Sequence, residues 1–175
     1  MDPHGIVRSL PSGVLLAVLA LILLQTSPAV AQATLPAHVG DQIGQHVFGI
    51  GIAAGPVSGI GLSFRHHLPG RFSYQVTGGI IKVDDKLSYA IGGEAQFDFT
   101  RRPSERFFLV LAAGYYHSGK SGDNELAGPG RVGLGVGGEL SLGGPVHASG
   151  EVLFSYFSDG NVLPLPQIGI HYYFY

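Results

Sequence analysis

The sequence predicts an all-β fold, an eight-stranded antiparallel up-and-down transmembrane β-barrel. From residue 46 to the last residue, short segments alternate apolar residues with Gly, Ser or charge, as in Ile60, Leu62 and Phe64. A period of two residues is typical of a strand with one apolar and one polar or small face. Many such strands without an intervening helical segment favour a sheet that closes on itself. Because the pattern follows an export-type segment, the apolar face is a candidate lipid face.

The N-terminal residues are typical of a cleaved secretory signal peptide. Arg8 supplies a positive charge, and the eleven residues of 14–24 form an apolar run. This run is too short for a membrane-spanning helix, which needs about 20 apolar residues, and the small residues Ala29, Ala31 and Ala33 fit a cleavage site. We therefore expect a cleaved signal peptide over 1–33, a flexible lead-in over 34–45 and a single barrel domain over 46–175.

The composition excludes several functional classes. Charged residues make up 13% of the chain, about half of the roughly 25% usual in soluble domains. The net charge is −2 and no basic run occurs, so nucleic acid is not an expected partner. The chain has no Cys, which excludes disulfides and a lipid-anchoring cysteine. We expect no cofactor.

The alternating segments are expected to form eight strands joined by short turns at one end and longer loops at the other. The predicted strands are 46–54, 57–67, 71–82, 86–100, 105–117, 130–142, 145–157 and 165–175. The connections at 67–70, 101–104 and 143–144 are compact, whereas 118–130 is the longest. The fourth outer connection is 158–161, followed by a stretch that contains Pro164 and Pro166. This asymmetry is typical of barrels that begin and end in the periplasm.

The composition of the polar or small face of the strands distinguishes a membrane barrel from a soluble one. A soluble ligand-binding barrel turns its apolar face inward and its polar face to water. Here the second face is rich in glycine, as at Gly133, Gly135 and Gly137, which weakens a water-facing strand but suits a narrow interior. Aromatic residues near strand ends, such as Tyr115–Tyr116 and 172–175, are typical of interfacial girdles. These features favour an outward apolar face, with a soluble periplasmic ligand-binding barrel as the alternative.

The last strand carries a further signal. Its apolar residues share one parity, through Ile168, Ile170, Tyr172 and Phe174, with Tyr175 one position beyond. On this pattern, residues 46–175 resemble the small eight-stranded outer-membrane β-barrel proteins of Gram-negative bacteria, whose last strand ends in an aromatic assembly signal. The resemblance implies a porin-like, monomeric outer-membrane protein that contacts membrane lipid and lipopolysaccharide. It also implies recognition of the C-terminal strand by the barrel assembly machinery.

If the apolar face points outward, the polar strand residues point inward and form a cluster that fills the barrel. Its expected members are Arg65, Glu94, Gln96, Asp98, Arg131, Glu139, His147, Glu151 and His171. Because buried charges need partners, we expect Arg65 to bridge acids, and one carboxylate to be protonated or paired with a histidine. Arg131 is expected near the outer end. The cluster is either a structural plug or a gated ion or proton path, and the narrow lumen of eight strands favours the plug.

No contiguous motif predicts catalysis. Lipid A deacylases carry a His-x-Ser-Asn pattern on the penultimate strand and a Glu downstream, whereas here Tyr156 and Asp159 flank that position and no Glu follows Ser158. A serine without a base is not an activated nucleophile. His147 and Ser149 share one parity and both point inward, away from outer lipid.

No spacing typical of a metal site or a phosphate loop occurs either. We therefore expect a non-enzymatic outer-membrane protein with a structural or surface-interaction role, and no catalytic or metal-binding residue. A lipid A-modifying enzyme and a narrow solute or proton channel are the alternatives within the membrane class.

Overall fold

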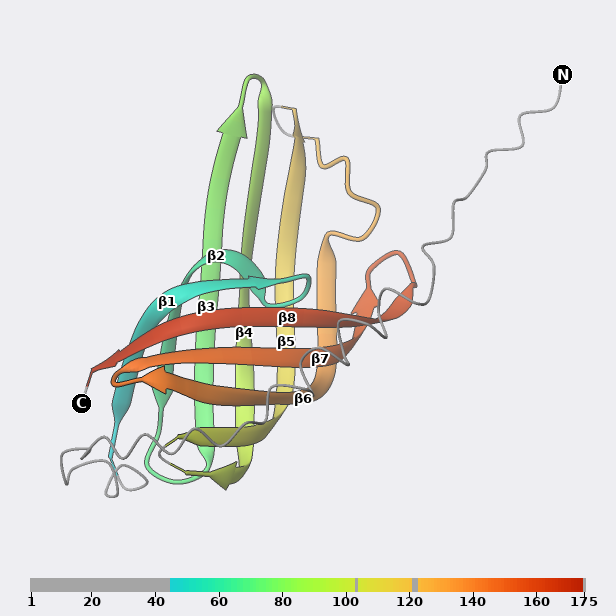
Figure 1. The fold of residues 1–175 in the computed structure, drawn as a ribbon. Coiled ribbons are helices and arrows are strands. Elements are labelled where there is room, and N and C mark those ends of the chain that lie inside the picture. Colours follow the sequence, from blue (N-terminus) through green and yellow to red (C-terminus); the bar gives the residue numbers. More distant parts are fainter. Residues whose placement is uncertain (1–44, 103, 121–122, 175) are drawn as a thin grey trace, which may run out of the picture. The chain divides into compact units, whose positions relative to one another are not determined.

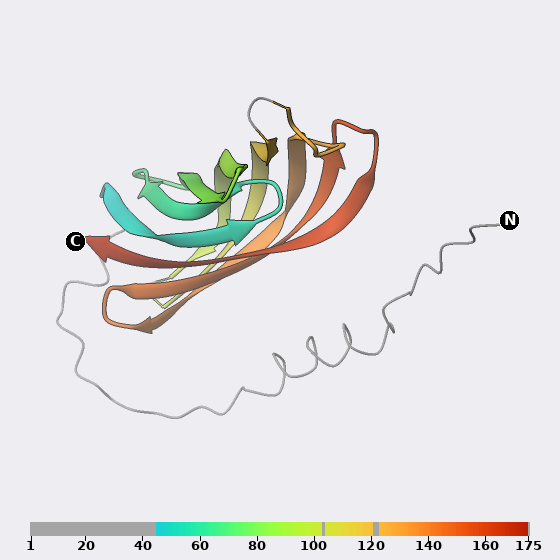
Figure 2. The same cartoon turned by 90° about the horizontal axis from the view of Figure 1, so that it is seen from above.

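The computed structural model describes residues 45–102, 104–120 and 123–174. The strands are β1 (Val47–Gly55), β2 (Gly59–His67), β3 (Phe72–Val83), β4 (Lys86–Arg101), β5 (Glu105–Lys120), β6 (Gly130–Gly143), β7 (Val146–Phe157) and β8 (Val162–Phe174). They pair in sequence order, and β1 pairs with β8 to close an antiparallel barrel (Figure 1, Figure 2). The predicted fold class is confirmed. The predicted signal peptide and all but the last residue of the lead-in lie outside the described residues.

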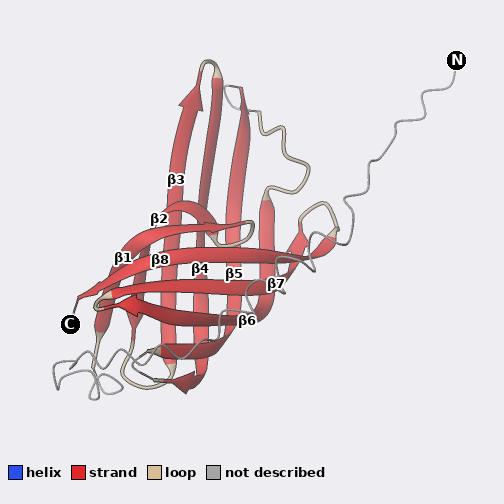
Figure 3. Cartoon of the chain, in the orientation of Figure 1, coloured by secondary structure: helices blue, strands red, loops and turns tan. Residues whose placement is uncertain are grey.

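Every regular element of the described chain is a strand (Figure 3). In this part of the chain we find no helix that has both the length and the apolarity to cross a membrane. The barrel has two rims. The terminal rim carries Val47 and Phe174, and the distal rim carries the β3–β4 turn at Asp84–Asp85 and the connection from β5 to β6. The connections at the terminal rim are short, as predicted.

Strand β8 starts earlier than predicted, at Val162 instead of residue 165, and contains both prolines. Pro164 pairs with Phe154 of β7, whereas pairing of β8 with β1 ends at Ile168. Residues 162–167 are therefore an edge with a partner on one side only. Proline has no N–H to donate and is tolerated on a strand edge, so the prolines that suggested a loop lie in a strand.

The β1–β2 hairpin is shorter than its neighbours. Pairing of β2 with β3 reaches only Leu62 and Gly78, and β3 continues to Val83 beyond it. Figure 1 shows the β3–β4 hairpin extending well past the β1–β2 turn. The wall thus has a gap between the free edges of β3 (79–83) and β8 (162–167), which we call the lateral notch.

Glycines let the end of this hairpin bend. Gly59 and Gly61 have φ angles of +109° and +137°, a backbone region that residues other than glycine rarely adopt. A Cβ on Gly61 would lie 2.2 Å from the carbonyl oxygen of Gly78. The hairpin end therefore lies against β3 closely enough to require glycine.

The two faces of the wall carry different side chains. Outward positions are apolar and exposed, as at Leu62 (73%) and Phe154 (67%), while the inward Arg65 is 1% exposed. This arrangement is the reverse of a soluble ligand-binding barrel. Tyr116 and Tyr173 are buried, so the assignment of these two to an interfacial girdle is wrong, because neighbouring residues on a strand face opposite sides.

The closure of the barrel requires a small residue on β1. A Cβ on Gly51 would lie 1.9 Å from the carbonyl oxygen of Ile170, whereas a Cβ on Gly150 of β7 meets nothing within 4 Å. We predict that Gly51→Ala lowers the free energy of unfolding by about 1–3 kcal/mol through overpacking, and that Gly150→Ala changes it little. Urea titration in detergent micelles, followed by circular dichroism, measures both. Equal unfolding midpoints for the two variants would contradict this account of closure.

Candidate functional site

Glu139 of β6 lies at the centre of the polar interior. Its Oε2 accepts hydrogen bonds from Arg65 of β2, from Arg106 Nη2 of β5 at 3.3 Å and from the Tyr173 hydroxyl of β8 at 2.9 Å. Its other oxygen lies 3.5 Å from His147 Nδ1 of β7. A single carboxylate therefore joins side chains from four other strands.

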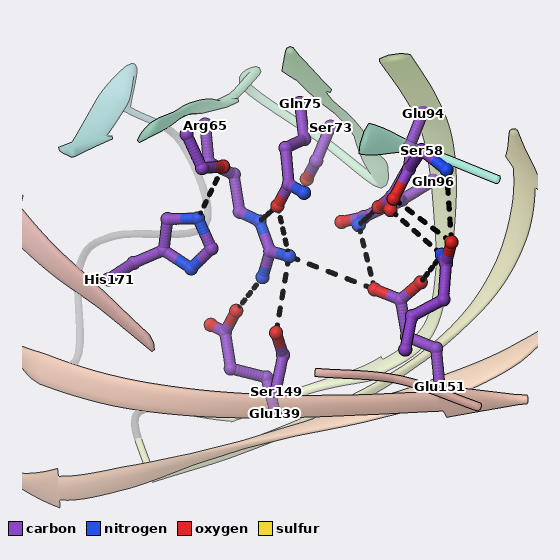
Figure 4. A network of polar contacts seen from close by, with 12 residues as sticks. Ser58, Arg65, Ser73, Gln75, Glu94, Gln96, Glu139, Ser149, Glu151 and His171 are labelled. Carbon is purple, nitrogen blue, oxygen red and sulfur yellow. Dashed lines mark hydrogen bonds and ion pairs between the residues drawn. The ribbon is translucent and has the colours of Figure 1, made fainter. Parts of the chain in front are cut away.

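Arg65 lies between two carboxylates (Figure 4). Beyond its contact with Glu139, its Nε donates to Gln75 Oε1 at 2.8 Å and its Nη2 to Ser149 Oγ at 3.3 Å. The same Nη2 is 3.8 Å from Glu151 Oε1. With 1% of its surface exposed, the guanidinium has exchanged water for protein acceptors, as a buried cation must.

Arg106 is a second buried guanidinium, which the sequence analysis missed. Its Nη1 donates to Asp98 Oδ1 at 2.9 Å and its Nη2 to Gln96 Oε1 at 2.9 Å, and its Cζ lies 4.3 Å from the centre of the Phe108 ring. The parity that it shares with Phe108 and Val110 signals an inward position. Because Arg106 lies beside the charged 101–104 turn, it was not assigned to the interior from the sequence.

The acidic residues outnumber these arginines. The buried described residues of the lumen include the carboxylates of Glu94, Asp98, Glu139 and Glu151. Two amides bridge Glu94 and Glu151: Gln96 Nε2 donates at 2.7 and 3.4 Å, and Gln167 Nε2 at 3.1 and 3.2 Å. Neutral donors thus satisfy the carboxylates that lie further from the arginines (Figure 4).

The β1–β2 turn folds into the barrel above this layer. Gln167 Oε1 accepts hydrogen bonds from the backbone N–H groups of Val57 at 3.1 Å and Ser58 at 3.0 Å. The Tyr116 hydroxyl accepts from Gly59 N at 2.9 Å and donates to Gly55 O. These contacts hold the turn inside the wall, although the predicted strands 46–54 and 57–67 imply only a short connection at the outer end.

The turn also supplies an apolar layer. Val57 has no exposed surface and belongs to a buried cluster with Phe108, Val110, Ala112 and Leu153. Opposite the turn, a Cβ on Gly114 would lie 2.0 Å from Val57 O. The interior is therefore filled from the terminal rim to the turn. Ion pairs lie nearest the terminal rim, and the apolar cluster lies beside the bridging amides, since Val110 pairs with Gln96 and Ala112 with Glu94. The turn lies on the distal side of both.

Arg131 lies apart from the other polar residues of the barrel interior, with which the sequence grouped it. It lies at the distal rim, where its Nη1 donates to Pro56 O at 2.7 Å and its Nε to Gly128 O at 3.1 Å. Its Cζ is 3.9 Å from the Tyr116 ring centre and 4.9 Å from that of Phe157. The β1–β2 turn, with Val57 of the apolar cluster, lies between Arg131 and the ion pairs of Arg65 and Glu139.

The histidines and serines of the interior bind one another and the ion pairs. Ser149 accepts from Arg65, and His147 contacts Glu139 and the Tyr173 ring. His171 Nε2 lies 2.9 Å from Ser63 Oγ, with both residues buried. Within the described ranges, no three potential metal-ligating residues lie together. These contacts cross-link the strands through the interior of the barrel.

Fold and interior together define a closed eight-stranded barrel with a polar filling and an apolar exterior. No family model and no curated protein matches the chain. The structure is similar to that of the Yersinia pestis outer membrane protein Ail in a phospholipid bilayer nanodisc, with a TM-score of 0.43 and 14% identity over 75% of this chain and 99% of that one. A major outer membrane protein from Thermus thermophilus gives a TM-score of 0.42 and 12% identity over 74% of this chain and 100% of that one. Both likenesses concern the fold alone.

Removing the central carboxylate tests the plug. We predict that Glu139→Gln lowers the free energy of unfolding by about 3–5 kcal/mol, because it leaves two buried guanidiniums short of a counter-charge. Unfolding in detergent micelles by urea measures the loss.

A matched control is Glu125→Gln in the β5–β6 connection. The Lys86 ammonium, 2.9 Å away, holds the pKa of Glu125 below its usual range, but both side chains are half exposed, so the pair contributes little. If the two variants were equally stable, Glu139 would not be the central contact of the plug.

Proposed function

We propose that this protein is an integral β-barrel of a bacterial outer membrane, with a structural or surface-interaction role and no catalytic activity. The observation that carries the proposal is the outer surface: all eight strands expose large apolar side chains, among them Ile52 (61%), Val136 (58%) and Ile168 (67%). A soluble monomer rarely exposes a continuous apolar patch beyond a few hundred Å². An apolar surface on every side of a barrel fits a surrounding solvent of lipid.

The closed wall supports the same conclusion. In a bilayer every backbone polar group needs a partner within the protein, and the closed sheet provides it from the terminal rim up to the lateral notch. Pairing of β1 with β8 runs from Phe48–Phe174 to Ala54–Ile168. Charged side chains are expensive in hydrocarbon unless they face the interior and pair, and Arg65 and Arg106 do both.

The filled interior favours a structural role over transport or catalysis. His147 and Ser149, the histidine and serine of one parity in β7, contact Glu139 and Arg65 inside the barrel instead of facing the outer lipid. Tyr156, at the position of a deacylase histidine, is 50% exposed on the outer face. We propose outer-membrane lipid and lipopolysaccharide as contacts, assembly through β8, and a monomeric state.

Electrophoresis tests membrane residence. We expect the protein to be recovered in the outer-membrane fraction of a Gram-negative host and to change mobility in SDS between unboiled and boiled samples, because a closed barrel resists the detergent until it is heated. A soluble periplasmic protein prepared alongside serves as the control. Recovery in the soluble fraction without a mobility shift would overturn the proposal.

Conductance separates a plug from a channel. In planar bilayers we expect no single-channel steps from the wild-type protein, because the β1–β2 turn and the ion pairs occupy the lumen. Arg65→Ala is expected to conduct no more than wild type, since the apolar layer around Val57 remains. Discrete steps in either protein would replace the structural role with transport.

A further inference from the structure

On the β3 side of the lateral notch, beside residues 79–81, lies a groove of about 1000 Å³. Ligand pockets usually have volumes of about 300–1,000 Å³. Ile60 and Leu62 of the outer face line one part of it, and Ala90 and Tyr116 of the inner face line another. The groove therefore runs from the lipid-facing side of the β1–β2 hairpin, past the turn, to the inside of β4 and β5.

The lining changes from apolar to polar along the groove. Its outer part is formed by Ile52, Ala54, Ile80 and neighbouring apolar residues. Its inner part includes Tyr116, Ser88 and Ser118. The hydroxyls of the two serines lie 3.0 Å apart. A groove with this gradient matches an amphiphile that has one long apolar section and a polar head.

The polar end of the groove carries a cation. Arg131 lines it and is held by the backbone carbonyls of Pro56 and Gly128. None of the ion pairs formed by the described carboxylates includes Arg131. The hydrogen bonds of Arg131 go to neutral acceptors, and Asp159 is the nearby carboxylate that acts on its charge without an ion-pair contact. A partly buried guanidinium with no carboxylate in direct contact can pair with an anionic head group.

The β8 edge of the notch argues against a protein strand as the occupant. A strand added to β8 would need donors along 162–167, and Pro164 and Pro166 supply none. The hairpin end cannot extend to fill the gap either, because Val57 and Ser58 are hydrogen bonded to Gln167 inside the barrel. The notch is thus a stable opening that is lined by side chains suited to an acyl chain.

We propose that the lateral notch binds one anionic lipid of the surrounding bilayer, with an acyl chain in the groove between the β1–β2 hairpin and the β3–β4 hairpin and its head group beside Arg131. The proposal rests on the membrane residence proposed above. It assigns this part of the wall a specific lipid, in contrast to the general lipid contact of the other strands.

Photocrosslinking tests the proposal. Full-length protein is reconstituted in phosphatidylcholine vesicles that contain a trace of phosphatidylglycerol with a diazirine in its acyl chain, and labelled peptides are mapped by mass spectrometry. We expect labels concentrated within 52–62 and 79–90. Ala54→Trp, which fills the groove from its outer wall, should reduce this labelling several-fold. Ala95→Trp, at an exposed outward position of β4 beyond the groove, should not.

A second comparison tests the head group. Phosphatidylcholine with the same diazirine chain should label the groove several-fold less, and Arg131→Gln should reduce phosphatidylglycerol labelling to that level. Labelling spread evenly over the outer face, an Ala54→Trp variant that labels like wild type, or equal labelling by the two lipids would each overturn the proposal. If Arg131→Gln does not fold, as judged by the mobility shift in SDS, the comparison of the two lipids on wild type decides the head group.

The same samples separate this proposal from the one on which it rests. Flotation with the vesicles and the heat-dependent mobility shift report membrane residence. Protein that neither floats nor shifts contradicts the outer-membrane assignment. Protein that floats and shifts without localised labels contradicts only the lipid site.

Discussion

The carboxylate of Glu139 is the contact on which the interior of this barrel depends. It accepts hydrogen bonds from Arg65, Arg106 and Tyr173 and lies beside His147, so that strands far apart in the sequence share one acceptor. Eight strands enclose little space, and charges buried there need donors and acceptors from the protein. The rest of the polar interior follows from that constraint, since each remaining carboxylate is bound by an arginine or by a glutamine amide.

The wall and its filling impose opposite demands on neighbouring residues. Outward positions such as Leu62 and Phe154 are apolar and exposed, while the positions next to them are small or polar. Glycine is required where strand or turn backbones approach, as at Gly114 against the β1–β2 turn. The high glycine content thus reflects the narrowness of the interior more than any flexibility of the strands.

The short β1–β2 hairpin has two consequences for function. Its inward turn contributes Val57 to the apolar layer that closes the lumen. Its shortness also leaves the edges of β3 and β8 unpaired toward the distal rim, where the groove beside Arg131 opens. One local feature therefore places the turn inside the barrel and leaves an opening in the side of the wall.

The sequence by itself determined the number and approximate bounds of the strands, because alternation is a local property that backbone geometry imposes on each segment. It also determined that Arg65 and Glu139 point inward. Only the tertiary structure decided that Arg106 shares Glu139 with Arg65, that backbone carbonyls bind Arg131, and that the β1–β2 turn enters the barrel. Those outcomes depend on the register between strands and on the available space, which no single segment encodes. The prolines of β8 show the same limit, since they indicate a loop locally and occupy a strand edge in the fold.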